Sequence, residues 1–162
     1  MATPVPRRPK FALGYTAGPD EPFEPDHWER IEGLLRESPN YWVSTVRPDG
    51  RPHAAPVWGV WLASEVWFST SPDSVKAHNL AAQPAAVIHL ESGDDVVILE
   101  GRCEAVSREH ELIPAFVADY KAKYGFKVNV RNPFTPIYRF HPERASTWIE
   151  PNFPRSNARW TL

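Results

Sequence analysis

The residues best suited to chemistry lie in one short segment, residues 69–76, which is typical of a strand end, a tight turn and a helix start. Ser71 stands where an N-cap belongs, and Pro72 follows at the first helical position, where its missing N–H costs nothing. Such a helix start offers free backbone N–H groups and the positive end of the helix dipole. Three hydroxyls and one ammonium surround it, from Ser69, Thr70, Ser74 and Lys76. This combination is suited to a phosphate group.

A plainer interpretation of the same segment stays open. Asp73 adds a negative charge in the same turn, which disfavours an anion. An ordinary capped helix with a solvated Lys76 would have the same spacing. The sequence alone does not decide between an anion site and a capped helix.

The elements around this segment are mostly short strands. Alternation and turn residues predict strands over Tyr41–Val46, His53–Trp61, Glu65–Thr70, Ala85–Glu91, Val96–Val106 and Ile137–Ile149. The last of these strands is expected to be interrupted near Pro142. Helical spacing predicts helices over Asp26–Glu37, Pro72–Ala82 and Arg108–Lys123. Ser107 is expected to cap the last of these helices, Pro114 to kink it, and Gly101 to mark a bulge. Strands joined by hairpins, with few helices between them, predict an antiparallel β-barrel with peripheral helices.

The chain divides into an arm and one domain. Residues 1–24 are rich in proline and are expected to form an extended N-terminal arm, made locally basic by Arg7, Arg8 and Lys10. Residues 25–162 contain no internal repeat and are expected to form a single domain.

Composition excludes several classes of function. The net charge of −2 gives no basic field for nucleic acid. No apolar run is long enough to cross a membrane, and there is no hydrophobic signal segment, so a cytoplasmic location is expected. The histidines show no metal-ligand spacing, so we expect no metal site. Cys103 is the only cysteine and is expected to be a small buried side chain rather than a nucleophile.

An ordered set of motifs resembles a known family. The set comprises the Pro-Asp-Gly-Arg-Pro turn at residues 48–52, then segments 56–58, 66–70, 74–80, 83–87 and 99–102. In this order they resemble the pyridoxamine-phosphate-oxidase-like superfamily of flavin- and deazaflavin-binding split β-barrels. The resemblance is good over residues 42–106 and looser over the C-terminal strand.

The resemblance carries its own expectations. It implies a mainly β, six-stranded antiparallel split barrel of the FMN-binding type, and a homodimer with the cofactor bound between subunits. It implies that the segment matching residues 68–70 lines the cofactor, that Ser74 and Lys76 hold its phosphate, and that Trp148 reaches the ring system from the partner chain. The residues expected to bind the cofactor are Val57, Trp58, Phe68, Ser69, Thr70, Ser74, Lys76, Asn79, Trp148 and Arg159.

The chain lacks some residues of the family pattern, which disfavours vitamin B6 oxidation. Vitamin B6 oxidases of the family carry an arginine and a lysine on the second strand, where this chain has Ala55 and Val60 or their neighbours. Segments 92–98 and 156–160 look more like the branch that uses a deazaflavin coenzyme of the 8-hydroxy-5-deazaflavin type. The resemblance therefore implies an oxidoreductase that transfers hydride between a deazaflavin or FMN and a small unsaturated substrate. The basic arm is a candidate to meet the anionic tail of the deazaflavin coenzyme.

Two alternatives remain, a non-enzymatic protein that binds or stores the cofactor and a dimeric structural protein with an empty barrel. The cofactor itself supplies the redox chemistry in such proteins, so no protein nucleophile is required. His53, His78 and Tyr41 are conceivable proton donors, and none is assigned a catalytic role.

Overall fold

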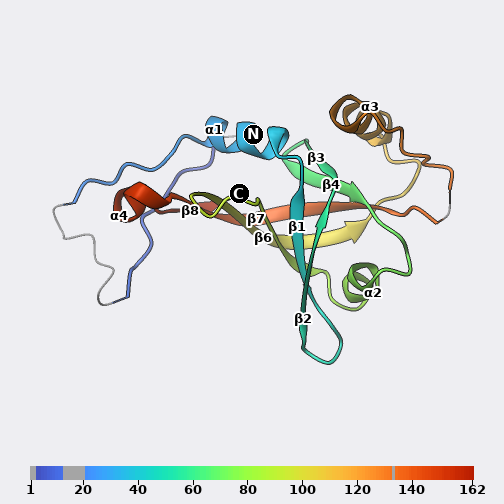
Figure 1. Cartoon of the computed structure of the whole chain (residues 1–162), viewed down its shortest axis with the longest axis horizontal. Coiled ribbons are helices and arrows are strands. Elements are labelled where there is room, and N and C mark those ends of the chain that lie inside the picture. The colour runs from blue at the N-terminus through green and yellow to red at the C-terminus, as the bar shows by residue number, and fades with distance from the viewer. Residues whose placement is uncertain (1–2, 13–20, 133) are drawn as a thin grey trace.

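The computed structural model describes residues 3–12, 21–132 and 134–162, and within them the protein is mainly β. Eight strands form one antiparallel sheet, with the helices at its edges and ends (Figure 1). The expected six strands are therefore two too few. One extra strand arises because the predicted strand His53–Trp61 is divided at Trp58, and the other is a C-terminal strand that sequence reasoning missed.

The elements follow one another in the order helix, four strands, helix, two strands, helix, strand, short helices, strand. The helices are α1 (Trp28–Glu37), α2 (Val75–Ala82), α3 (Ile113–Tyr124), the 3-10 turn η1 (Glu150–Asn152) and α4 (Phe153–Ser156). The strands are β1 (Tyr41–Val46), β2 (Pro52–Val57), β3 (Gly59–Leu62), β4 (Glu65–Ser69), β5 (Ala85–His89), β6 (Asp95–Ala105), β7 (Ile137–Ile149) and β8 (Ala158–Thr161).

A single residue, Trp58, closes the sheet into a partial barrel. The strand order is β2-β1-β5-β6-β7-β4-β3, so β2 and β3 lie at the two ends of the path. Yet Val57 ends β2 and Gly59 begins β3, with only Trp58 between them. The two ends of the path must therefore meet at this corner, which a sheet can do only by curling.

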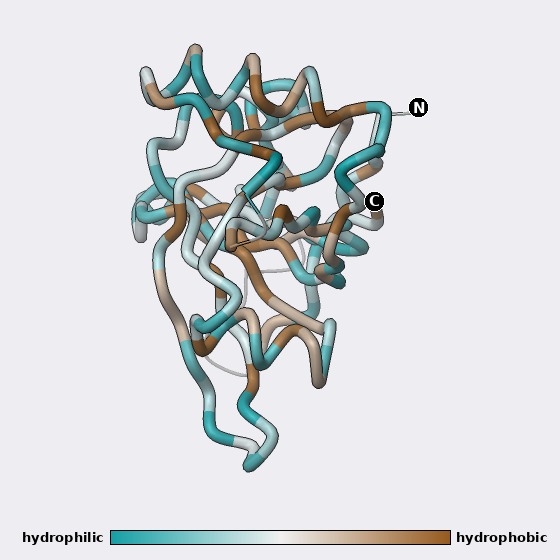
Figure 2. Tube along the Cα trace, turned by 90° about the vertical axis from the view of Figure 1, so that its right-hand side faces the viewer, coloured by the Kyte–Doolittle hydropathy of each residue, from teal (hydrophilic) through white to brown (hydrophobic). Residues whose placement is uncertain are grey.

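Alternation along the strands decides which face is buried. In β1, Tyr41, Val43 and Thr45 are buried, while the residues between them are partly exposed. The buried face joins the main core, where Phe68, Ile88, Leu99 and Phe140 are fully buried. The β1–β2 hairpin projects from the sheet (Figure 1), and its tip at residues 47–51 is hydrophilic (Figure 2).

Helix α1 begins two residues later than the sequence predicts, and the other two predicted helices also begin late. In α2 the N-cap is Ser74, whose hydroxyl accepts the N–H of Ala77 at 3.2 Å, and not Ser71. Ser71 instead forms the preceding turn, since its Oγ accepts the N–H of Asp73 at 3.2 Å. Both serines are good caps, and the serine nearer the regular helix takes the role.

Helix α3 differs from the predicted helix Arg108–Lys123 at its start. It starts at Ile113 and not at Arg108, and Pro114 stands in its first turn rather than as a kink within it. Proline lacks an N–H and is tolerated in the first turn only, so the helix cannot extend upstream through it without strain. Residues 107–112 form turns instead, and Ser107 does not cap the helix.

Gly101 meets the expectation of a bulge. The register of β6 against β7 shifts between Glu100 and Gly101, where Gly101 lies opposite Pro142. A Cβ built on Gly101 would lie 2.1 Å from the carbonyl oxygen of His141, so only glycine fits there. Cys103, on the same strand, is buried as expected, and burial raises the pKa of its thiol to about 12.

The described part of the arm lies along the last strand. The backbones of Arg7 and Arg159 exchange two hydrogen bonds of 2.8 Å, an antiparallel bridge that extends the sheet beyond β8. Residues 13–20 of the predicted arm lie outside the described residues. In the described ranges, no helix combines the length and apolarity needed to cross a membrane.

Candidate functional site

The candidate site lies in the turn between β4 and α2. Thr70, Ser74 and Lys76 form a short chain of polar contacts there. The Nζ of Lys76 donates to the Oγ1 of Thr70 at 3.2 Å, and that hydroxyl donates to the Oγ of Ser74 at 3.3 Å. The turn thus brings together three of the residues that the sequence proposes as phosphate ligands.

Lys76 has an uncompensated charge. Partial burial lowers the pKa of its ammonium, and none of the ion pairs among the described residues includes it. A partly desolvated cation with only a hydroxyl for a partner is stabilised by an incoming anion. The donor set of one ammonium and two hydroxyls beside a helix N-terminus therefore fits a phosphate group.

Two further basic side chains lie near this cluster. Burial, followed by the charges of Arg47 and Lys76, lowers the pKa of His53. His53 pairs with Thr45, to which Asn79 of α2 donates a hydrogen bond, so His53 lies on the side of the hairpin that faces α2. Sequence reasoning did not include Arg47 or His53 among the ligands. The available signal was the pairing of β1 with β2, which puts His53 opposite Thr45 on the face that α2 covers.

Ser69 and Asn79 are already engaged within the protein. The Oγ of Ser69 donates to the carbonyl of Pro136 at 3.0 Å, and the Nδ2 of Asn79 donates to the Oγ1 of Thr45 at 2.8 Å. Asn79 is buried, so its amide fastens α2 to β1. Both residues support the turn around Lys76, and neither extends the chain of hydroxyls.

Val57 and Phe68 have buried side chains. Both belong to the main core, where the ring of Phe68 stacks on that of Tyr138 with centroids 5.5 Å apart. Only the backbone of either residue is left to face a ligand.

Trp58 presents a flat aromatic surface at the barrel corner. It is 49% exposed and stacks on Tyr124, with ring centroids 4.8 Å apart and planes 4° from parallel. Lys123 lies beneath this corner, donating to the carbonyl of Gly59 at 3.0 Å and to the Oη of Tyr41 at 3.3 Å. Burial lowers the pKa of Lys123 to about 8.

Trp148 and Arg159 lie at the other end of the molecule. Ile137 at the start of β7 pairs with Ser69, while Trp148 near its end pairs with Val96. A strand rises about 3.3 Å per residue, so roughly 35 Å of strand separate these positions. Figure 1 shows α2 toward one end of the long axis and α4 with β8 toward the other. One subunit therefore does not bring Trp148 or Arg159 to Lys76.

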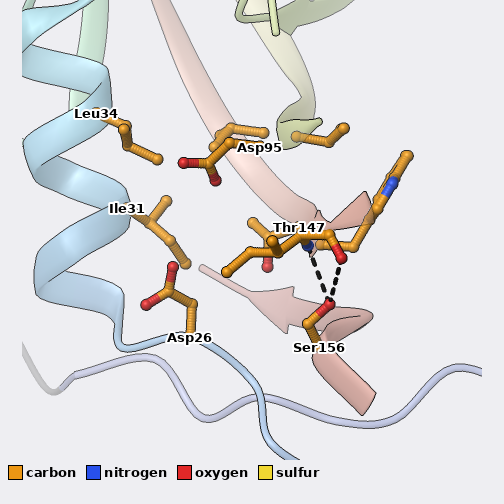
Figure 3. Close-up of a pocket in the computed structure, with 10 residues that line it drawn as sticks. Asp26, Ile31, Leu34, Asp95, Thr147 and Ser156 are labelled. Atoms are coloured by element: carbon orange, nitrogen blue, oxygen red, sulfur yellow. Dashed lines mark hydrogen bonds between the residues drawn. The ribbon is translucent and has the colours of Figure 1, made fainter. Parts of the chain in front are cut away.

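The surroundings of Trp148 are closely packed. Its Nε1 donates to Glu150 at 2.8 Å, and it lines a cavity of only about 10 Å³ between α1 and the ends of β6 and β7. Ile31 and Leu34 of α1 and Asp95 border that cavity, and Ser156 beside it bonds to the backbone of Ile149 (Figure 3). A space of this size holds about one water molecule, so it is no cofactor site.

The basic arm is also remote from the Lys76 cluster within one subunit. Arg7 bridges to Arg159 at the β8 edge, and the guanidinium of Arg8 lies over the ring of Phe23 while donating to the carbonyl of Glu21 at 2.8 Å. Arg8 is thus held against the protein's own backbone.

Among the described residues, no group of three or more His, Cys, Asp or Glu side chains could hold a metal ion. An open depression of about 530 Å³ lies against α3, bordered by Val117 and residues 127–131, and it includes none of the predicted site residues.

The curled antiparallel sheet and the polar turn before α2 define a half-barrel class of protein with a candidate anion site. The sequence profile of the family described as pyridoxamine 5'-phosphate oxidase matches residues 28–149. The chain belongs to this family, which confirms the resemblance. No curated protein matches it in sequence.

Solved structures share the fold. The conserved hypothetical protein Rv2991 from Mycobacterium tuberculosis is 26% identical, with a TM-score of 0.65 over 75% of this chain and 84% of that one. An F420 reductase is 23% identical, with a TM-score of 0.57 over 71% of this chain and 94% of that one. The heme storage protein HutZ from Vibrio cholerae is 19% identical, with a TM-score of 0.62 over 71% of this chain and 89% of that one.

Proposed function

We propose that this protein is an oxidoreductase that binds FMN or a deazaflavin coenzyme and transfers a hydride between that cofactor and a small unsaturated substrate. Family membership supports a flavin-type ligand. The observation that carries the proposal is Lys76, a partly buried cation with hydroxyl neighbours and no carboxylate partner among the described residues.

The residues have distinct roles in this proposal. Lys76 and the hydroxyls of Thr70 and Ser74 hold the cofactor phosphate, and the free N–H groups at the start of α2 add to the positive potential. The bound cofactor supplies the hydride chemistry. The chain binds and orients it, with the backbone of Val57 and Phe68 and the exposed ring of Trp58 as candidate walls.

The proposed assembly is a homodimer. Within one subunit Trp148 and Arg159 lie at the far end of β7 from Lys76. They can take part in the same site only if they come from a second copy of the chain. We infer that each site combines the α2 turn of one subunit with the β7–β8 end of its partner.

The test is a titration of the cofactor-free protein with FMN and, separately, with the deazaflavin coenzyme, followed by tryptophan emission. Lys76→Ala is expected to weaken binding by about 1–3 kcal/mol, the effect of removing a charged hydrogen-bonding partner. Lys121→Ala is the matched control, since Lys121 is exposed on α3. Equal affinity of the Lys76→Ala variant and the parent protein would refute the proposed phosphate site.

A second candidate is a protein that binds a cofactor without catalysis. This candidate is supported by the similarity of the fold to that of the heme storage protein HutZ. Substrate-dependent oxidation of the reduced, protein-bound cofactor would support the enzyme. Tight binding of heme, with no such oxidation for any substrate, would support the binding protein.

A further inference from the structure

His53 occupies a defined position beside the α2 turn. It pairs with Thr45 across the β1–β2 hairpin, and paired residues of an antiparallel ladder project to the same face. Thr45 is buried and accepts a hydrogen bond from Asn79 of α2. The imidazole of His53 therefore lies on the face of β2 that α2 covers.

The ring of His53 has an unused polar atom. Its Nδ1 is buried and has no hydrogen-bond partner among the described residues. Although His53 as a whole is only partly buried, this atom would be stabilised by a hydrogen bond to a ligand.

The charged surroundings of His53 are basic. Arg47 at the end of β1 and Lys76 on α2 both act on it electrostatically. The nearest carboxylates in sequence are Asp49, which is paired with Arg51, and Asp73, which is exposed before α2. The other histidine of this region, His78, is exposed on α2. Like charges repel, so an anion bound between the β1–β2 hairpin and α2 would stabilise these basic groups.

We propose that His53 is a further anion-binding residue, which donates a hydrogen bond from its ring to the phosphate that Lys76 also holds, with Arg47 adding positive charge. This inference rests on the proposed phosphate site. It assigns the β1–β2 hairpin to that site, alongside the α2 turn.

A reciprocal effect follows from linkage. In the free protein, burial and the charges of Arg47 and Lys76 lower the pKa of His53. A bound dianion stabilises the imidazolium and must raise that pKa, and by the same free energy the anion binds more tightly when His53 is protonated. The anion affinity should therefore rise as the pH falls through the pKa of His53.

The first experiment measures this pKa in the parent protein by NMR titration of its histidine rings. Sulfate is the probe, because it stays a dianion across the range, whereas a phosphate monoester titrates near pH 6. The pKa of His53 is expected to rise at saturating sulfate. A His53 pKa that does not move while sulfate binds overturns the inference.

The second experiment compares FMN affinity at pH 6 and pH 8 in the parent protein and in His53→Gln. The variant is expected to lose roughly five- to thirtyfold in affinity at pH 6 and less at pH 8. His78→Gln is the control and should change neither value. If Lys76→Ala weakens FMN binding but His53→Gln does not, the proposed function stands and this inference fails. If FMN, deazaflavin and sulfate all fail to bind the parent protein, both fail.

Discussion

The amide of Asn79 on α2 donates a 2.8 Å hydrogen bond to the hydroxyl of Thr45 on β1, and both side chains are buried. This pair fixes the helix that carries Lys76 against the hairpin that carries His53. Asn79, which the sequence suggests as a cofactor ligand, thus acts on the site through the position of α2.

Removal of this amide should destabilise the protein. Asn79→Ala leaves the Thr45 hydroxyl without its partner, so the free energy of unfolding should fall by about 1–3 kcal/mol. Urea denaturation followed by tryptophan emission measures it. His78→Ala, at an exposed position on the same helix, should change stability by less than about 0.5 kcal/mol. Equal stability of the two variants would show that the bond contributes nothing.

Replacement by alanine is expected to have opposite effects on stability at Gly101, in the β6–β7 bulge, and at Gly33, in α1. Gly101→Ala would put its Cβ 2.1 Å from the carbonyl of His141 and should cost about 1–3 kcal/mol or prevent folding. Gly33→Ala in α1 meets nothing within 4 Å and should stabilise the protein by about 0.5–1 kcal/mol, because alanine is the better helix former. Thermal unfolding of both variants checks the pair, and a stable Gly101→Ala protein would contradict the assigned register.

Some strands of the sheet can be predicted from the sequence, and others cannot. The alternation of β1 and the bounds of β7 are predicted correctly. The interruption expected near Pro142 is a shift of register against β6, and β7 continues through it as one strand. The corner at Trp58 was missed, because the apolar run continues through it and the pairing partner changes from β1 to β4. Strand β8 was missed because its residues pair with β7 and bury Ala158 and Trp160, a tertiary effect without a local signature.

Only part of the candidate site can be predicted from the sequence. Thr70, Ser74 and Lys76 are close in sequence, so the local spacing was enough to group them. His53 comes to the same region as Lys76 only through the packing of α2 on the hairpin, which no spacing rule in the sequence predicts. The burial of Phe68 and the engagement of Ser69 also depend on partners distant in sequence, Tyr138 and Pro136.

Lys123 predicts a pH dependence of stability. Its pKa is lowered from 10.5 in the unfolded chain to about 8 in the folded protein by burial. Between these values the unfolded state binds more protons, so the contribution of Lys123 to stability rises with pH over this window. Against Lys123→Met, the parent protein should therefore gain stability between pH 8 and 10.

Urea midpoints at pH 7, 8, 9 and 10 measure this difference. In the folded protein, burial raises the pKa values of Tyr41 and Tyr120, so both titrate mainly above this window. Lys121→Met is the control, because Lys121 is exposed. A difference between the parent protein and Lys123→Met that stays constant with pH would contradict the lowered pKa.

The separation of Lys76 and Trp148 along β7 gives a test of the shared site. Lys76→Ala and Trp148→Ala should each weaken cofactor binding when purified alone. If every site takes Lys76 from one subunit and Trp148 from the other, a mixed dimer of the two variants contains one intact site and one doubly altered site. Random reassortment of subunits should then restore parent-like affinity in about a quarter of all sites.

The measurement is a cofactor titration after the two variants have been unfolded and refolded together, with each variant refolded alone as the control. A high-affinity phase that occurs only in the mixture requires that the two residues come from different subunits. Trp148→Ala also removes packing against Phe153, so the mass of the dimer must be checked for each sample. Dimers that form normally but show no high-affinity phase in the mixture would place Trp148 outside the cofactor site. The end of β7 would then have a structural role, and Lys76 would bind its anion with residues of its own subunit.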